Sequence, residues 1–236
     1  MKSCIVLSGQ YRTFDQTWPK IKEFIDLNEL DVYCHLWSTD ETEIKNVTDR
    51  LNPKNIMVED SSSYDKMFAD MEKNILLTNP KTPSQIWDPS RDKISGNASM
   101  NYGRKAGLNL VPKDVYDYVV YCRYDIGFKR MFNFDGSIDR IITPLEESYN
   151  LISDIFAIIP MAMVKGYFLY DEYERLHSTD FEPEFVEWLR NIKMYPERDI
   201  QVHRYHKYCP HSSLLRNIIM KGTNFYITDL PIYLQR

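Results

Sequence analysis

The chain of 236 residues is long enough to bury a substantial core, and its 43% hydrophobic and 27% charged residues exclude wholesale disorder. The formal net charge of −5 argues against a nucleic-acid-binding protein, which usually carries a basic excess. An acidic protein that binds an anionic nucleotide needs a metal ion or well-placed Arg and Lys residues to offset the repulsion.

The cysteines and apolar runs bear on where the protein works. No two cysteines are close enough in the sequence for a CxxC zinc pair; they are Cys4, Cys34, Cys122 and Cys209. We interpret them as reduced thiols of a cytosolic protein. No apolar run reaches the roughly 18–20 residues of a membrane span, and the N-terminal run is too short for a signal peptide. We therefore expect a cytoplasmic protein without a transmembrane segment, whose membrane contact would be peripheral.

The first part of the chain alternates between predicted strands and helices. Ser3–Leu7 is an apolar run that ends in Ser8-Gly9-Gln10, as a buried parallel strand does when it enters a loop. A helix follows, opened by a capping box of Thr13 and Gln16. The next predicted elements are a strand at Asp31–Trp37, a helix at Thr39–Leu51 and a strand at Asn55–Glu59. This order is typical of a doubly wound α/β fold.

The rest of the chain continues the alternation after a long loop predicted for Thr78–Ser95, which contains three prolines. The predicted helices are Tyr64–Leu77, Ala98–Leu110, Val164–Leu176, Glu182–Ile192 and Ser212–Met220. The predicted strands are Tyr118–Arg123 and Asn224–Leu234, with a further apolar segment at Ile155–Met163. No repeat or linker divides the sequence. We expect one domain over residues 1–236, of the α/β class, with a central mostly parallel sheet flanked by helices.

The first candidate site is the segment Ser8, Gly9, Gln10 and Arg12 at the carboxyl end of the first strand. Ligands of open α/β sheets lie beyond the carboxyl ends of strands. Small residues there let backbone N–H groups approach a nucleotide, and Arg12 is placed to pair with a phosphate. The segment also fits a tight turn in which glycine supplies only backbone freedom. It has neither Walker nor GxGxxG spacing.

The second candidate site is Arg123-Tyr124-Asp125, which ends the most apolar predicted strand. A carboxylate, a divalent metal and a diphosphate form a workable set, since Mg²⁺ is usually held by one or two carboxylates plus phosphate oxygens. Arg123 and Asp125 lie two residues apart, so on a strand their side chains face the same side and can bind one ligand. The alternative is a mutual salt bridge between them.

Weaker candidates complete the set. Asp154 is either a general base for an acceptor hydroxyl or a helix cap. His211, near His203 and His206, is either a metal ligand or a solvated side chain. Arg104 and Lys105 either reach a donor's phosphates or solvate a helix face. Among the tryptophans, Trp37 at the end of the second strand is the best candidate for a ligand-facing ring.

Together these segments resemble a family of small GT-A-fold glycosyltransferases found in large DNA viruses, phages and bacterial surface-polysaccharide clusters. Leu7–Phe14 is similar to the family's "SGQ-R-T/S-F" opening, and Asp31–Trp37 to its "D-V-F-x-H-x-W" strand. Tyr118–Phe128 is similar to "R-x-D-x-x-F", a version of the DxD motif, and Ser153–Ala157 to "D-x-F-A". The matches span most of the chain, with Thr78–Ser95 and His177–Pro210 outside them.

The resemblance implies a hexosyltransferase-type enzyme that moves sugar from a UDP- or GDP-linked donor to a glycan or glycoprotein hydroxyl, with Mn²⁺ or Mg²⁺ as cofactor. Residues 1–128 would bind the nucleotide and residues 129–236 the acceptor, in the host cytoplasm if the protein is viral. The residues that match the motifs would divide the work as follows: Ser8, Gly9, Gln10 and Arg12 line the nucleotide, Asp125 holds the metal, and Arg123 replaces the first Asp of DxD.

The resemblance leaves part of the chemistry open. Arg123 can itself neutralise phosphate charge, which bears on how strictly a metal is needed. His211 stands where related proteins often have Glu after Pro, which favours it as a metal ligand. Asp154 would be the base of an inverting mechanism, whereas a retaining one needs no such base. Rival functions are a sugar nucleotidyltransferase, which usually shows a Gly-rich basic loop near its N-terminus, and a noncatalytic nucleotide- or glycan-binding module.

Overall fold

The computed structural model describes residues 1–64, 94–112, 114–134, 136–146, 151–152, 155–164, 225–228 and 230–234. The helices predicted for 64–77, 164–176, 182–192 and 212–220 lie outside these residues, apart from Tyr64 and Val164, and so does most of the predicted loop at 78–95. No helix in the described part of the chain is long and apolar enough to cross a membrane.

A central sheet organises the described residues, with strand order β3-β2-β1-β4-β8-β6-β7 and β9 beside β6. Its strands are β1 (Ser3–Gln10), β2 (Asp31–Trp37), β3 (Asn55–Glu59), β4 (Tyr118–Cys122), β6 (Ile141–Glu146), β7 (Leu151–Ile152), β8 (Phe156–Pro160) and β9 (Phe225–Thr228). β1 pairs in parallel with β2 and β4, and β2 with β3. β8 runs antiparallel to β4. A separate antiparallel pair joins β5 (Ile126–Phe128) to β10 (Ile232–Leu234).

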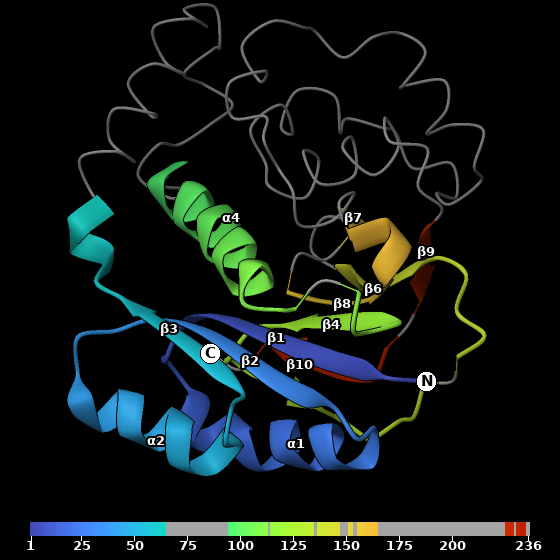
Figure 1. Cartoon of the computed structure of the whole chain (residues 1–236), viewed down its shortest axis with the longest axis horizontal. Coiled ribbons are helices and arrows are strands. Elements are labelled where there is room, and N and C mark those ends of the chain that lie inside the picture. The colour runs from blue at the N-terminus through green and yellow to red at the C-terminus, as the bar shows by residue number, and fades with distance from the viewer. Residues whose placement is uncertain are drawn as a thin grey trace, which may run out of the picture.

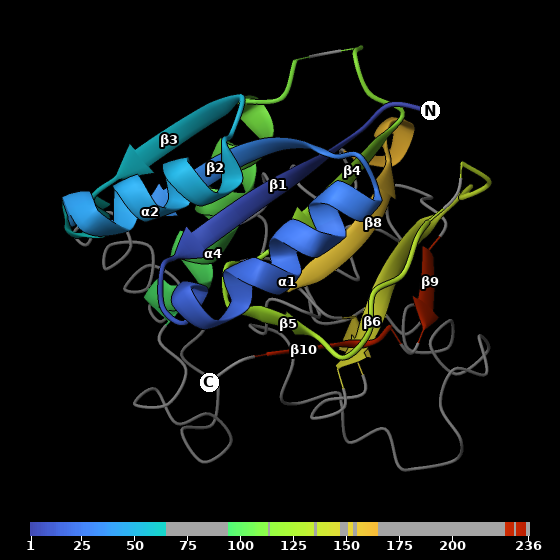
Figure 2. The ribbon, with the colours of Figure 1, turned by 90° about the horizontal axis from the view of Figure 1, so that it is seen from below.

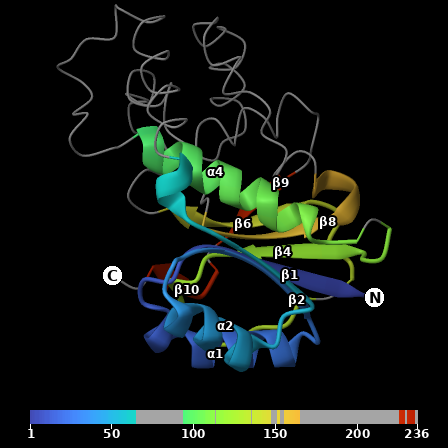
Figure 3. The same cartoon turned by 60° about the vertical axis from the view of Figure 1, so that its left-hand side comes forward.

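Helices cover both faces of this sheet, which confirms the predicted fold class. α1 (Phe14–Leu27) and α2 (Glu41–Leu51) lie on one face, and α4 (Ile94–Asn109) lies on the other (Figures 1 and 3). Figure 2 shows α1 and α2 in front of β1 and β2. The alternation of side chains along β1 serves both layers, because Ile5 and Leu7 join the core under α1 while Cys4 and Val6 join the core under α4.

The core under α1 is rich in phenylalanine. Phe24 is fully buried, stacks on Phe128 with ring centroids 4.9 Å apart, and also contacts Phe132 and Phe156 at 5.1 and 5.8 Å. These rings come from α1, β5, β8 and the segment after β5, so one side chain joins elements that are far apart in the sequence. The described cysteines Cys4, Cys34 and Cys122 are all buried free thiols, in agreement with the reduced state expected from the sequence.

Several element boundaries differ from the sequence-based prediction. Ser8-Gly9-Gln10 is not a loop, because β1 continues through Gln10 in register with β2. Thr13 precedes α1, but its side chain makes no capping hydrogen bond, so the Thr13 half of the predicted capping box is wrong. α2 begins at Glu41, where the Asp40 carboxylate accepts a hydrogen bond from the Thr42 N–H at 2.7 Å. The single strand predicted for 224–234 is two strands, β9 and β10, in different sheets.

Candidate functional site

A pocket lies at the carboxyl ends of β1, β2 and β4, the edge at which open α/β sheets bind ligands. It encloses about 570 Å³ of space between atoms, part of it open solvent. The described residues that line it are Ser8, Gly9, Gln10, Arg12, Trp37, Ser99, Met100, Arg123, Tyr124 and Asp125. The structure therefore brings the two main sequence-predicted segments, which are more than a hundred residues apart, to one cavity, and places Trp37 with them.

The backbone at the end of β1 and just after it has positive φ at two residues. Gly9 has φ of +136°, and a Cβ atom at this position would meet nothing within 4 Å, so a ligand can approach the main chain there. Arg12 has φ of 42°, the left-handed region that L-residues other than Asn, Asp and Gly rarely occupy. Strain of this kind persists where the surrounding structure imposes it, and it concentrates at ligand sites.

The Arg123-Tyr124-Asp125 segment is anchored through its central residue. Tyr124 is fully buried and meets Phe14 edge to face at 5.5 Å, and its carbonyl accepts a hydrogen bond from Thr17 Oγ1 at 2.5 Å. The Arg123 N–H donates to the Ile155 carbonyl at 3.1 Å. Because the middle side chain points into the core, the residues on either side of it are left to face the pocket.

Asp125 binds both arginines of the pocket. Its Oδ1 accepts from Arg123 Nε at 2.9 Å, and its Oδ2 accepts from Arg123 Nη2 at 2.6 Å and from Arg12 Nη1 at 3.1 Å. The Asp125 side chain is only 4% exposed, against 51% for Arg12 and 16% for Arg123. The salt bridge considered as an alternative is thus present, and it joins the two predicted sites. A buried carboxylate needs such partners, because an unpaired buried charge is strongly destabilising.

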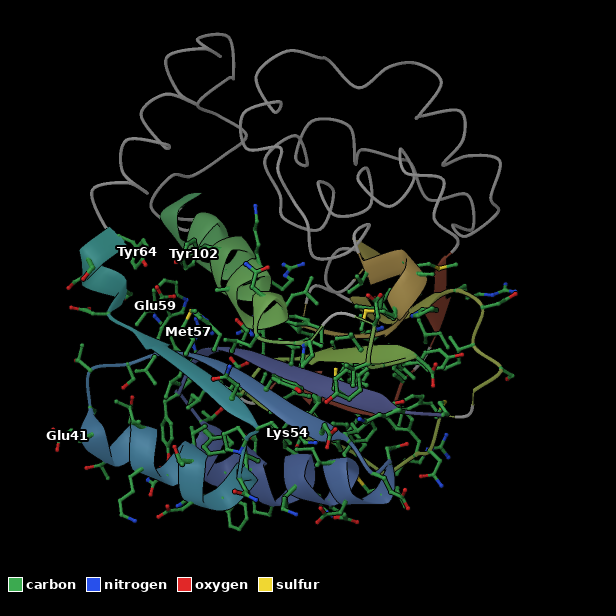
Figure 4. The ribbon with its side chains drawn as sticks, viewed as in Figure 1. Glu41, Lys54, Met57, Glu59, Tyr64 and Tyr102 are labelled. Atoms are coloured by element: carbon green, nitrogen blue, oxygen red, sulfur yellow. The ribbon has the colours of Figure 1, made fainter. Side chains whose placement is uncertain are left out.

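A second polar network lies behind the pocket and was not predicted. His35 is fully buried in β2; its Nδ1 lies 3.3 Å from Ser8 Oγ and its Nε2 lies 2.9 Å from Glu59 Oε2. Glu59 Oε1 also accepts hydrogen bonds from the hydroxyls of Tyr64 and Tyr102. Figure 4 shows Glu59, Tyr64 and Tyr102 together where β3, the following 3₁₀ turn (Ser61–Tyr64) and α4 meet.

This network fixes the protonation of its members. Burial alone would raise the pKa of Glu59, but hydrogen bonds from Tyr64, His35 and Tyr102 hold it below its ordinary value, so the carboxylate is ionised. The His35 Nε2–H therefore donates to Glu59, which leaves Nδ1 to accept from the Ser8 hydroxyl. Burial lowers the pKa of His35 below its ordinary 6.5, although Glu59 acts in the opposite direction. Ser8, a pocket residue, is thus oriented by a neutral histidine.

The stability of the protein is expected to fall as the pH is lowered through the region just below 6.5. Unfolded His35 takes up a proton there that the folded protein resists, so the free energy of unfolding decreases, by at most about 1.4 kcal/mol per pH unit from this residue. Glu59 titrates below its ordinary 4.5 and does not contribute in this window. Urea unfolding at several pH values between about 7.5 and 5.5 measures the slope.

The variant His35→Gln is the control for this prediction. It removes one titrating group and leaves every other histidine in place, so its free energy of unfolding should vary less with pH than that of the wild type. Equal slopes for the two proteins would contradict a neutral, buried His35.

α4 approaches the sheet closely at glycines. A Cβ atom at Gly103 would stand 2.9 Å from both His35 Nδ1 and Ser8 Oγ, so glycine leaves room for that hydrogen bond. Ser99 and Met100 of the same helix line the pocket and had no sequence signal. Arg104 and Lys105, predicted to bind the donor, are not among the described lining residues. Arg104 is buried with its guanidinium 5.2 Å from the centre of the Tyr121 ring.

The remaining sequence-predicted site residues, Asp154 and His211, lie outside the described residues. The residues described do not fit a metal centre as they stand. Asp125 is the sole acidic residue among the described pocket residues, and both of its oxygens already accept hydrogen bonds from arginines. No group of three or more His, Cys, Asp and Glu side chains suited to a metal occurs in the described part of the chain.

Comparison with known proteins yields no family model and no curated protein that matches the sequence. Three solved structures similar to this chain are glycosyltransferases. Mouse xyloside xylosyltransferase 1 is 10% identical (TM-score 0.41; 97% of this chain and 86% of that chain). Glycosyltransferase GlyE of Streptococcus pneumoniae is 11% identical (TM-score 0.44; 96% of this chain and 45% of that chain). The galactosyltransferase LgtC, in complex with donor and acceptor sugar analogs, is 12% identical (TM-score 0.42; 94% of this chain and 72% of that chain). Likeness at this level assigns neither a family nor an activity, so the function must be inferred from the site.

Proposed function

We propose that the protein is a glycosyltransferase that takes a hexose from a UDP- or GDP-linked donor and transfers it to a hydroxyl of a glycan or glycoprotein. The observation that carries this proposal is the pair Arg12 and Arg123, joined on the buried Asp125 at the carboxyl edge of the sheet beside Trp37. A cationic cluster next to an aromatic ring suits a ligand with a diphosphate at one end and a base at the other.

Different residues of the pocket suit the different parts of such a donor. Trp37 lines the pocket and is only 6% exposed, so a small part of its ring surface is open to contact with a base or a sugar. Arg12 and Arg123 offer guanidinium N–H groups to the diphosphate, and the open space at Gly9 admits its oxygens to the backbone. All of the described pocket residues precede residue 128, which supports a nucleotide-binding first half. We propose that residues 129–236 bind the acceptor.

In the proposed reaction the acceptor oxygen attacks the anomeric carbon of the donor. The bond from that carbon to the diphosphate oxygen breaks, and a bond to the acceptor oxygen forms. Arg12 and Arg123 stabilise the negative charge that develops on the departing diphosphate. The acceptor proton passes to Asp154 if the reaction inverts the anomeric centre. Asp154 precedes Ile155, whose carbonyl accepts the hydrogen bond from the Arg123 N–H.

A thermal-shift screen with nucleotides and nucleotide sugars tests the proposal. UDP or GDP and their sugar conjugates should raise the Tm, since ligand at one hundred times its Kd stabilises by about 2.7 kcal/mol, or roughly 5–10 °C for a chain of this size. Adenine nucleotides serve as the control and should give smaller shifts. If no nucleoside diphosphate or nucleotide sugar shifts the Tm, with or without Mg²⁺ or Mn²⁺, the proposal is wrong.

A second assay separates the transferase from its rivals. Slow donor hydrolysis, measured as release of UDP or GDP from the nucleotide sugar, is expected of a glycosyltransferase without its acceptor. Release of pyrophosphate from a nucleoside triphosphate and a sugar phosphate would instead identify a nucleotidyltransferase. Binding with neither reaction, even with glycan acceptors present, would leave a noncatalytic module.

A further inference from the structure

The contacts of Asp125 bear on how the pocket neutralises an anion. Three charge-assisted hydrogen bonds, of 2.6, 2.9 and 3.1 Å, occupy its two oxygens, and a carboxylate has about four lone-pair positions. Arg123 binds as a fork through two of its nitrogens, which is the strongest arrangement available to this pair. A divalent cation ligated by Asp125 would be placed within a few ångströms of both guanidinium groups and would repel them.

The described charges of the cluster leave a positive excess. Among the described residues, two guanidinium groups and one carboxylate give the cluster a net charge of +1. Because the carboxylate is almost completely buried while half of the Arg12 side chain is exposed, the positive charge is the part of the cluster that faces the pocket. Arginine remains charged at any pH of interest and matches phosphate oxygens through parallel N–H groups. The cluster is therefore preorganised for an anion such as a diphosphate.

The backbone supports the same interpretation. Arg12 occupies its left-handed conformation and donates from Nε to the Gln10 side chain at 3.1 Å and from Nη1 to Asp125. Two separate contacts thus hold one long side chain in place, at a position whose backbone disfavours arginine. Fixing both guanidinium groups before the ligand arrives reduces the entropy that binding must overcome.

We propose that Arg12 and Arg123 bind the diphosphate without a divalent cation, and that Asp125 is a positioning residue for the two guanidinium groups instead of a metal ligand. This inference rests on the proposed function only in taking the diphosphate to be part of a nucleotide sugar. The anion site itself is tested with inorganic pyrophosphate, which has no base and no sugar.

The central experiment is calorimetric titration of the wild-type protein with inorganic pyrophosphate in EDTA, repeated with Mg²⁺ in place of EDTA and corrected for the heat of magnesium pyrophosphate formation. The expected result is binding in EDTA with an affinity within about threefold of that in Mg²⁺. No binding in EDTA together with clear binding in Mg²⁺ would overturn the proposal. Because this comparison uses the unaltered protein, it does not depend on any variant folding.

Arginine variants test which groups bind. Arg12→Ala and Arg123→Ala should each weaken pyrophosphate binding in EDTA by at least about tenfold, since each removes charge-assisted hydrogen bonds. The chain offers a matched control in Arg140, which forms a fork with Asp139 on the surface and is not among the described pocket residues. Arg140→Ala should leave the affinity unchanged. If all three variants lost the same affinity for pyrophosphate, the change in net charge alone would explain the loss. The assignment of Arg12 and Arg123 as the binding groups would then be wrong.

Asp125→Asn separates a positioning role from metal ligation. If Asp125 positions the arginines, the ratio of affinities in Mg²⁺ and in EDTA stays near one in both wild type and variant. If Asp125 ligates a metal, that ratio is large in the wild type and falls to one in the variant. The variant also leaves two guanidinium groups short of a counter-charge, so pyrophosphate in EDTA should raise its Tm more than that of the wild type, whereas Asp139→Asn should respond like the wild type.

The two proposals fail in different ways. Pyrophosphate binding in EDTA without any response to UDP, GDP or their sugar conjugates would support the anion site and refute the glycosyltransferase. Donor hydrolysis that is lost in EDTA would support the glycosyltransferase and refute the metal-free site.

Discussion

Arg123→Ala is expected to lower kcat/KM for cleavage of the nucleotide sugar by about 10²–10³-fold, as the loss of a preorganised group at a developing charge does in other enzymes. The fold should survive the change. Asp125 keeps its contact with Arg12, so the buried carboxylate is not left without a positive partner, and the Arg123 N–H that bonds to Ile155 belongs to the backbone. Initial rates of UDP or GDP release, with the Tm measured in parallel, provide the test.

Arg123→Lys refines this result. Lysine keeps the charge but cannot form the two-nitrogen fork to Asp125, so an intermediate loss is expected. Arg140→Ala makes the same chemical change at the surface pair with Asp139 and should leave the rate unchanged. If Arg123→Ala turned over the donor as fast as the wild type does, the departing diphosphate would have to lie elsewhere.

Phe24→Ala is expected to lower the free energy of unfolding by about 3–5 kcal/mol, the range found for buried phenylalanines. The ring is fully buried and contacts three other phenylalanines, at 4.9, 5.1 and 5.8 Å. The neighbouring rings come from β5, β8 and the segment after β5, and they cannot all move into the space that alanine would leave. Urea unfolding followed by circular dichroism measures the difference.

Two variants act as controls for Phe24→Ala. Phe24→Leu retains most of the volume and should cost less than about 1.5 kcal/mol. Leu27 lies in the same helix, and its side chain is 44% exposed. Leu27→Ala should therefore change the free energy of unfolding by about 0.5 kcal/mol or less. A loss for Phe24→Ala no larger than that for Leu27→Ala would show that the aromatic cluster does not stabilise the fold.

The first three strands could be predicted from the sequence because each contains an apolar run, although β1 extends past its run through Ser8-Gly9-Gln10. The bounds of β2 and β3 match the prediction, and Asn52 ends α2 in the left-handed conformation. β5 and β6 were missed for a physical reason. β5 has three residues and depends on β10, about a hundred residues away, and β6 contains Pro144, which argues against a strand.

The pocket was predictable to the extent that it follows from topology. β1 and β4 are neighbours and parallel, so the residues that follow them meet at one edge. The Arg12–Asp125 ion pair was not predictable, because it depends on the left-handed backbone of Arg12. His35 and Glu59 were passed over as well. A histidine inside an apolar strand, with an acidic residue ending the next strand, was the available signal.

The buried thiols give the protein built-in reporters of unfolding. Burial raises the pKa of Cys34 to about 12, and it raises the pKa of Cys4 and of Cys122 further still, so these thiols are protonated and inert in the folded protein. They lie in β2, β1 and β4, at the centre of the sheet. With Cys209 replaced by serine, the rate of thiol alkylation would report opening of these strands without an optical probe. An anion bound between the ends of β1 and β4 would then be detected as a decrease in the rate of thiol alkylation.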